Sequence, residues 1–245
     1  MKFIISLTSF GRRLINTAPY AIRSILNQSE KPDRIILWLS YETNIPKELA
    51  ILEQEGLEIK FCEDFRSYNK LIPALKHFPN DIIITIDDDV IYPIDWFKKT
   101  KLSYLKNPIN IHVNRAHEII VEGENLQSYK SWKFCVSTVE KEQSIFPTGV
   151  GGVLYPPNTL HPEIHYSSLF STLAPKGDDL WFWAMARLYN TKYTIIEGGY
   201  KDLVYINPYD HGMWIDNLYN GGNDIQLMNI LKNYPTLIDL LENLI

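Results

Sequence analysis

The sequence predicts an α/β protein with a mixed, mostly parallel sheet flanked by helices. Strand-like and helix-like segments alternate between residue 1 and about residue 107, the pattern that produces a parallel sheet with helices on both faces. The strand-like segments are continuous apolar runs such as Ile82-Ile83-Ile84, typical of strands buried on both faces. No internal repeat and no linker rich in Gly or Ser interrupts the chain, so we expect a single domain over residues 1–245.

Each element of the amino-terminal part has its own signal. The first helix carries apolar residues at helical spacing (Ala21, Ile22, Ile25 and Leu26). The second begins with Pro46 and stops just before Gly56, the expected asymmetry of helix ends. The last strand of this part is bounded by Pro79-Asn80 before it and by aspartates after it. These signals predict strands at residues 3–7, 34–39, 57–62 and 81–86, and helices at residues 17–28, 46–55 and 70–77.

The pattern weakens after Asn107-Pro108. Residues 114–148 are polar and have no clear period, so we expect an irregular segment there. Pro235 ends one carboxyl-terminal helix before a final apolar one. This half is predicted to contain strands at residues 109–113 and 193–197, a glycine-rich strand at 149–156, and helices at 178–189 and 224–233.

Composition excludes several classes of protein. The net charge of the 245 residues is −5 and the basic residues are scattered, so no nucleic-acid partner is expected. The two cysteines, Cys62 and Cys135, do not suggest a disulfide-rich fold, and because they form no CxxC pair we expect neither a zinc site nor a thioredoxin motif. No apolar run is long enough for a transmembrane helix, and the apolar start of the chain is too short for a signal peptide. We therefore expect a cytoplasmic protein.

The most informative stretch is Asp87-Asp88-Asp89, which follows a buried apolar strand. Ligands of open α/β sheets bind beyond the carboxyl ends of the strands. Two such carboxylates 4 Å apart repel each other by about 4 kcal/mol at an effective dielectric constant of 20. A divalent cation removes that repulsion, and oxygen ligands suit Mg²⁺ or Mn²⁺. Because side chains alternate along an extended chain, Asp87 and Asp89 are the predicted metal pair.

This arrangement resembles the GT-A fold glycosyltransferases, whose fold is Rossmann-like and whose Asp-x-Asp motif holds a metal on the diphosphate of a nucleotide-sugar. Further segments are similar to those of bacterial capsule and lipopolysaccharide glycosyltransferases. They are Thr8-Ser9-Phe10-Gly11-Arg12-Arg13, Ser29-Glu30-Lys31-Pro32-Asp33-Arg34-Ile35, Gly151-Gly152-Val153-Leu154-Tyr155-Pro156 and Asp178-Asp179-Leu180-Trp181-Phe182. The matches extend from about residue 4 to residue 183.

The resemblance assigns the donor and the metal to residues 1–107 and the acceptor and the base to residues 108–245. The resemblance implies a cofactor, Mn²⁺ or Mg²⁺, and a nucleotide-sugar donor, which by analogy with the family is expected to be a UDP-sugar. The donor-binding residues that it implies are Thr8, Ser9, Arg12, Arg13, Asp64, Lys70, Asp87, Asp88, Gly151 and Gly152. Arginine is favoured for this role because its guanidinium group matches phosphate oxygens.

In the resembled family an acidic pair at the start of a helix supplies the catalytic base. The pair here is Asp178 and Asp179, and Asp179 is expected to take the proton from the acceptor hydroxyl, which implies inversion. His211 is the expected third metal ligand beside Asp87 and Asp89. On the acceptor side the candidates are His112, Arg115 and His117, and Trp132, Trp181 and Trp183 are candidate sugar-facing aromatics.

The expected function is therefore a metal-dependent glycosyltransferase that acts on a glycan or glycolipid acceptor in lipopolysaccharide or capsule synthesis. A peripheral contact with the inner membrane face and a homo-oligomer are compatible with its apolar carboxyl-terminal segment at residues 225–245. Two alternatives remain open: a haloacid-dehalogenase-like phosphatase, which also uses Asp-x-Asp after a strand, and a non-catalytic carbohydrate-binding protein. A sugar nucleotidyltransferase is disfavoured because no Gly-x-Gly-Thr-Arg loop follows the first strand.

Overall fold

The computed structural model describes residues 1–123, 125–206 and 213–242. Its centre is a seven-stranded sheet in the order β13-β6-β12-β4-β1-β2-β3. Every neighbouring pair in this sheet is parallel except those that involve β12, which runs antiparallel to both β4 and β6. The strands are β1 (Phe3–Thr8), β2 (Arg34–Ser40), β3 (Leu57–Cys62), β4 (Ile82–Thr85), β6 (Ile111–Val113), β12 (Val153–Tyr155) and β13 (Tyr193–Ile195). The predicted mixed α/β fold is confirmed.

Helices cover both faces of the sheet because its strands are apolar on both sides. Along β1, Ile4 packs into one core cluster and Ile5 into the other, and both are fully buried. The core on the Ile5 side is built with α1 (Arg13–Asn16), α2 (Ala18–Leu26), α3 (Lys47–Glu53) and α5 (Trp96–Lys106). The core on the Ile4 side is built with α4 (Ile72–His77), α6 (Ser167–Leu173), α7 (Asp178–Leu188), α9 (Gly222–Asn233) and α10 (Thr236–Glu242).

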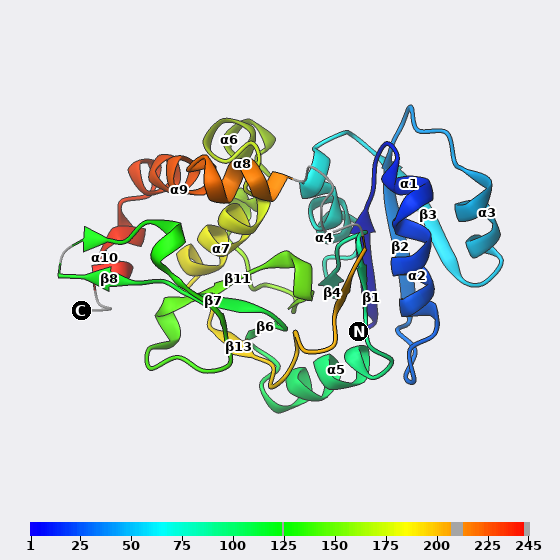
Figure 1. The fold of residues 1–245 in the computed structure, drawn as a ribbon, viewed down its shortest axis with the longest axis horizontal. Coiled ribbons are helices and arrows are strands. Elements are labelled where there is room, and N and C mark those ends of the chain that lie inside the picture. Colours follow the sequence, from blue (N-terminus) through cyan, green and yellow to red (C-terminus); the bar gives the residue numbers. More distant parts are fainter. Residues whose placement is uncertain (124, 207–212, 243–245) are drawn as a thin grey trace.

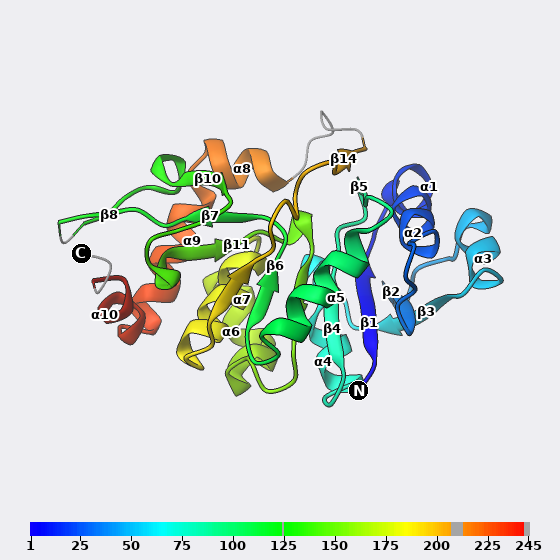
Figure 2. The same ribbon diagram turned by 90° about the horizontal axis from the view of Figure 1, so that it is seen from below.

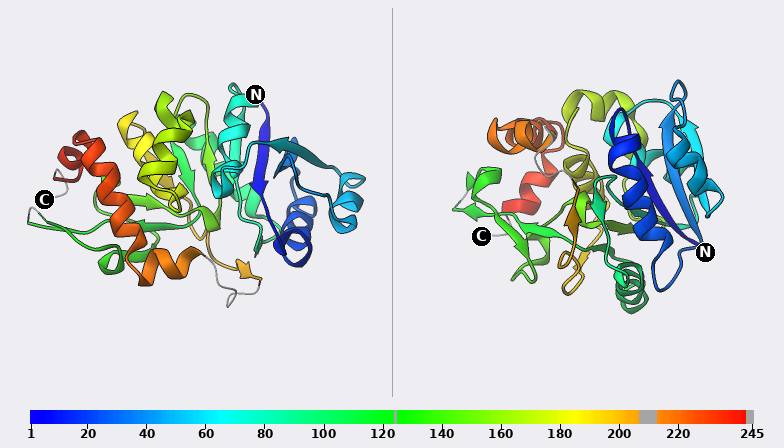
Figure 3. Two further views of the ribbon diagram at one scale, coloured as in Figure 1. Left: turned by 90° about the horizontal axis from the view of Figure 1, so that it is seen from above. Right: turned by 45° about the vertical axis from the view of Figure 1, so that its right-hand side comes forward.

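The amino-terminal and carboxyl-terminal helices lie at opposite ends of the molecule. In Figure 1 the blue helices α1 to α3 are at one end and the orange and red helices α9 and α10 at the other. Figure 3 shows the same separation from two further directions. Strands β1, β4, β6 and β13 lie between the two groups in Figure 1, whereas β2 and β3 lie beside α1 to α3.

Residues 114–148 are more ordered than the sequence predicted. They form β7 (Ala116–Glu118), β8 (Val121–Glu122), β9 (Asn125–Leu126), β10 (Lys133–Val136) and β11 (Ile145–Pro147). Strands β10, β7 and β11 make a separate small sheet. The expectation of an irregular segment was therefore wrong. The strands were missed because they are very short, and because β10 has a register shift between Lys133 and Val136 with a positive φ of 55° at Cys135. Such a bulge removes the alternation by which a strand is recognised in sequence.

Other boundaries also differ from expectation. The glycine-rich strand is a 3₁₀ turn at Gly149–Gly151 followed by the short strand β12. Helix α5 was not predicted, because its lysines obscure the buried positions Trp96, Phe97, Thr100 and Tyr104. A two-stranded ribbon pairs β5 (Val90–Ile91) with β14 (Val204–Tyr205), side by side in Figure 2. The remaining helical elements are α8 (Met213–Tyr219) and the 3₁₀ turns at Arg66–Lys70, Tyr129–Ser131, Glu142–Ser144 and Pro162–His165.

Candidate active site

The three aspartates lie at one edge of the central sheet, where the ends of β1 and β4 and the start of β12 come together. Because β4 is parallel to β1, the residues after β4 adjoin the loop that follows β1. Because β12 is antiparallel to β4, the glycines that precede β12 reach the same edge. Asp87, Asp88 and Asp89 line a cavity of about 510 Å³ at this place. This is the carboxyl edge at which open α/β sheets bind their ligands.

Asp88 is tied to the loop after β1. The hydroxyl group of Ser9 donates a hydrogen bond to Asp88 Oδ2 at 2.5 Å, and the Arg13 guanidinium lies 2.9 Å from Asp88 Oδ1. Asp88 is 5% exposed, and burial raises its pKa although Arg13 and Ser9 act in the opposite direction. Arg13 also lies 2.9 Å from Asp89 Oδ2, so one guanidinium group bridges two of the three carboxylates.

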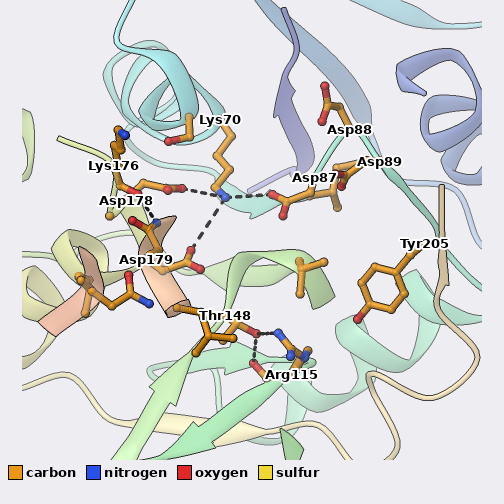
Figure 4. Close-up of a pocket in the computed structure, with 18 of the residues that line it drawn as sticks. Lys70, Asp87, Asp88, Asp89, Arg115, Thr148, Lys176, Asp178, Asp179 and Tyr205 are labelled. Carbon is orange, nitrogen blue, oxygen red and sulfur yellow. Dashed lines mark hydrogen bonds and ion pairs between the residues drawn. The ribbon is translucent and has the colours of Figure 1, made fainter. Parts of the chain in front are cut away.

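Lys70 is the buried cation on the other side of the motif. Its Nζ atom lies 2.9 Å from Asp87 Oδ1, 2.8 Å from Asp178 Oδ2 and 3.9 Å from Asp179 Oδ1. In Figure 4 Asp87 points toward Lys70, whereas Asp88 points away from it. Burial alone would lower the pKa of Lys70, but the charges of Asp178 and Asp87 raise it well above its ordinary value. Lys70 is therefore a permanent positive charge among the carboxylates.

Asp178 and Asp179 begin α7 but have different surroundings. Neither forms the side-chain cap of the helix. Asp178 is 7% exposed and faces Lys70, whereas the Asp179 carboxylate accepts a hydrogen bond from the Gly149 amide at 2.9 Å and lines the cavity. Burial and the negative charge of Asp178 raise the pKa of Asp179 to about 7 against the opposing effect of Lys70. A carboxylate with such a pKa is suited to accept a proton at neutral pH.

Gly149 permits this arrangement. A Cβ atom on Gly149 would lie 2.5 Å from Lys70 Nζ and 2.8 Å from Asp179 Oδ1, so any side chain there would displace both groups. The next glycines serve packing within the protein instead. A Cβ atom on Gly151 would collide with Arg115, and one on Gly152 with the ring of Trp96. Neither Gly151 nor Gly152 lines the cavity.

Carboxylates placed in this way can hold a divalent cation when other ligands complete its coordination. Burial and the neighbouring charge of Asp87 raise the pKa of Asp89 to about 6, which is the strain that a bound cation relieves. Among the described residues no group of three or more His, Cys, Asp or Glu side chains forms a complete metal site. Mg²⁺ is commonly held by one or two carboxylates together with substrate phosphates and water. Asp87 and Asp89 are the pair that would hold it.

The remaining predicted residues occupy different places. Thr8 lines the cavity, although its hydroxyl donates to the Trp38 carbonyl at 2.9 Å. Arg12 and Asp64 are exposed and lie outside the cavity lining, and Asp64 accepts a hydrogen bond from the Arg66 amide at 2.8 Å. The predicted third metal ligand, His211, lies outside the described residues.

The far side of the cavity is formed by residues that sequence analysis found only in part. Arg115 and His117 line it as expected, but His112 is fully buried elsewhere. The missed residues include the aromatic side chains Tyr129, Phe134, Phe146 and Tyr205. Aromatic residues gathered in the polar segment 114–148, which shows no helical or strand periodicity, were the signal in the sequence that could have indicated this wall of the cavity. The candidate sugar-facing tryptophans Trp132, Trp181 and Trp183 are at most 4% exposed, so they belong to the core instead.

Comparisons with known proteins identify the fold. No protein-family model and no curated protein matches the chain. Among solved structures, a 4-diphosphocytidyl-2C-methyl-D-erythritol synthase matches with a TM-score of 0.50 and 10% identity, over 86% of this chain and 95% of that one. A CMP:2-keto-3-deoxy-manno-octonic acid synthetase complexed with CTP matches with a TM-score of 0.48 and 9% identity, over 80% of this chain and 88% of that one. The chain therefore shares its mixed α/β fold, with a mostly parallel sheet, with the first of these structures.

This finding contradicts the predicted glycosyl transfer. The matched structure is named as a 4-diphosphocytidyl-2C-methyl-D-erythritol synthase and not as a glycosyltransferase. Neither the phosphatase nor the carbohydrate-binding alternative fits the comparison better. The error has a physical reason: carboxylates after a buried strand show where phosphates and a metal are held, and this is common to reactions that break different bonds.

The described helices include none with the length and apolar character needed to cross a membrane.

Proposed function

We propose that the protein is a metal-dependent nucleotidyltransferase, which transfers the nucleotide group of a nucleoside triphosphate to a small polyhydroxylated acceptor and releases pyrophosphate. The observation that carries this proposal is the group of three aspartates with Lys70 and Arg13, placed in one cavity at the carboxyl edge of the sheet. The match to a diphosphocytidyl synthase over most of both chains supports it.

The two ends of this group have complementary tasks. Asp87 and Asp89 would hold Mg²⁺ or Mn²⁺, which when bound supplies positive charge to the triphosphate. Arg13, whose side chain is 26% exposed, retains donors for phosphate oxygens beside its contacts with Asp88 and Asp89. Lys70 keeps Asp87 oriented and offsets the charge of Asp178.

Asp179 is the proposed base. The acceptor hydroxyl oxygen forms a bond to the α-phosphorus while the bond from that phosphorus to the bridging oxygen of the β-phosphate breaks. The hydroxyl proton passes to Asp179, and pyrophosphate leaves with the electron pair of the broken bond. The position of Asp179 between Lys70 and Thr148 in Figure 4, together with its pKa of about 7, suits this role.

The proposal is tested by thermal unfolding with ATP, CTP, GTP or UTP, each with and without Mg²⁺. One triphosphate is expected to stabilise the protein only with Mg²⁺, by about 2.7 kcal/mol at 100 times its dissociation constant. Asp87→Asn and Asp89→Asn should abolish this effect, whereas Glu122→Gln, at an exposed residue outside the cavity, should preserve it. If no triphosphate stabilises the protein, the proposed function is wrong.

A further inference from the structure

The cavity contains a second cation that the phosphate end does not use. Arg115 follows β6, on the opposite side of the cavity from Lys70 and Asp87 in Figure 4. Its Nε atom donates to Cys135 Sγ at 3.2 Å and its Nη1 atom to Thr148 Oγ1 at 3.1 Å. Within the described part of the chain, no carboxylate forms an ion pair with Arg115. A guanidinium group held by neutral partners keeps its full charge and free donors for an anionic ligand.

His117 adds a neutral donor next to Arg115. The Cys135 amide donates to His117 Nδ1 at 3.1 Å, so the proton of the neutral ring is on Nε2. Burial, assisted by the charge of Arg115, lowers the pKa of His117 to about 3. The ring therefore stays neutral at physiological pH and contributes a hydrogen-bond donor rather than a second charge.

An aromatic wall completes this side of the cavity. The His117 ring stacks on Phe134 with centroids 4.3 Å apart, and Phe134 lies 5.8 Å from Tyr129. Phe134 is 41% exposed although it lines the cavity, so its ring is accessible to a ligand. Aromatic faces pack well against the C–H faces of a ring compound. Arg115, His117 and Phe134 thus combine anion recognition with a flat apolar surface.

We infer that Arg115 and His117 bind an anionic substituent of the acceptor while Phe134 and Tyr129 pack against its ring. The acceptor class is therefore a hydroxylated ring compound that carries a carboxylate or a phosphate group away from the reacting hydroxyl. This inference rests on the proposed function for the identity of the ligand as the acceptor. The anion bound by Arg115 remains intact during the reaction, since the bond forms at the hydroxyl near Asp179.

The test is titration calorimetry of the full chain without nucleotide, using glucuronate, glucose 1-phosphate, glucose and inorganic phosphate as probes. We expect glucuronate or glucose 1-phosphate to bind at least about tenfold more tightly than glucose. The preferred anion then distinguishes a carboxylate acceptor from a phosphate acceptor. Weaker binding of inorganic phosphate than of glucose 1-phosphate is expected if the ring is recognised.

Three variants separate the roles. Arg115→Met should weaken binding of the preferred anion by about tenfold or more, and Arg115→Lys should restore part of it. Phe134→Ala, at a half-exposed position, should weaken the binding of the ring compounds but leave the binding of inorganic phosphate unchanged. Arg23→Met, which changes an exposed arginine on α2, is the matched control, and it should bind all four probes with the affinity of the wild type.

The inference is overturned if glucose binds as tightly as the anions, if no anion binds, or if Arg115→Met leaves binding intact. These outcomes are independent of the proposed function, because the titration contains no nucleotide. Conversely, anion binding lost in Arg115→Met together with no response to any triphosphate would leave the subsite standing and reject nucleotidyl transfer.

Discussion

The Lys70 ammonium lies 2.8 Å from the Asp178 carboxylate, and this contact joins the two predicted halves of the chain. Lys70 ends the 3₁₀ turn before α4, and Asp178 begins α7. Both residues are almost fully buried, at 6% and 7% exposure. The pair therefore positions the base-bearing helix relative to Asp87, which Lys70 contacts at 2.9 Å.

The first prediction concerns the removal of this buried cation. Lys70→Met should lower the free energy of unfolding by about 3–5 kcal/mol, because it leaves buried carboxylates without a partner. Adding Asp178→Asn should recover part of the loss by removing one of those charges. Urea denaturation of both variants measures the effect.

The matched control for Lys70 is Lys98→Met, which changes an exposed lysine on α5. Lys98→Met should change the free energy of unfolding by no more than about 0.5 kcal/mol. A similarly small effect of Lys70→Met would show that the buried network does not stabilise the fold.

The second prediction concerns pH. Asp89 has a pKa of about 6 in the folded protein and an ordinary value of 3.8. The folded state therefore binds more protons between these values, and this group reduces stability as the pH rises from about 4 to 6. Asp89→Asn removes that loss, so in chelator the variant should gain about 1–2 kcal/mol relative to wild type by pH 7. A pH-independent difference in unfolding free energy would contradict the assigned surroundings of Asp89.

The third prediction separates Asp88 from its neighbours. Asp88→Ala removes the acceptor of Ser9 and Arg13 and should cost about 1.5–3 kcal/mol of stability, the range for hydrogen bonds to a charged group. Ser9→Ala should cost less, since the bond between Arg13 and Asp88 remains. Chemical denaturation in chelator gives both values. Equal stability of wild type and Asp88→Ala would rule out this structural role.

The fourth prediction uses Gly149. Gly149→Ala should perturb Lys70 and Asp179 and cost about 1–3 kcal/mol by overpacking. Gly123→Ala is the comparison, because nothing lies within 4 Å there and only its φ of +56° makes the substitution unfavourable, by about 1–2 kcal/mol. Stabilisation by triphosphate and Mg²⁺ should be reduced only in Gly149→Ala. An equal reduction in both variants would mean that Gly149 has no special place in the site.

Much of the amino-terminal half was predictable because its signals are local. The apolar runs of β1, β2 and β4 and the Asp87-Asp88-Asp89 motif each appear within a few adjacent residues. Once β1 and β4 are known to pair in parallel, it follows that the segment of Ser9 lies next to the aspartates.

The opposite side of the cavity was less predictable because it depends on contacts distant in sequence. Phe134 lies within the irregular stretch of β10, at the edge of the small sheet, and Tyr205 lies on β14, which pairs with β5. The transferred group was not predictable for a different reason. Asp87 and Asp89 specify a place for phosphates and a cation, whereas the bond that breaks depends on how both substrates lie in the cavity.

The most direct test of the account is to identify the leaving group with Mg²⁺, the stabilising triphosphate and the anionic ring compound that binds best. We predict release of pyrophosphate with formation of a nucleotidyl-acceptor product, and loss of both in Asp179→Asn with triphosphate binding retained. Release of inorganic phosphate without such a product, or undiminished pyrophosphate release by Asp179→Asn, would contradict it.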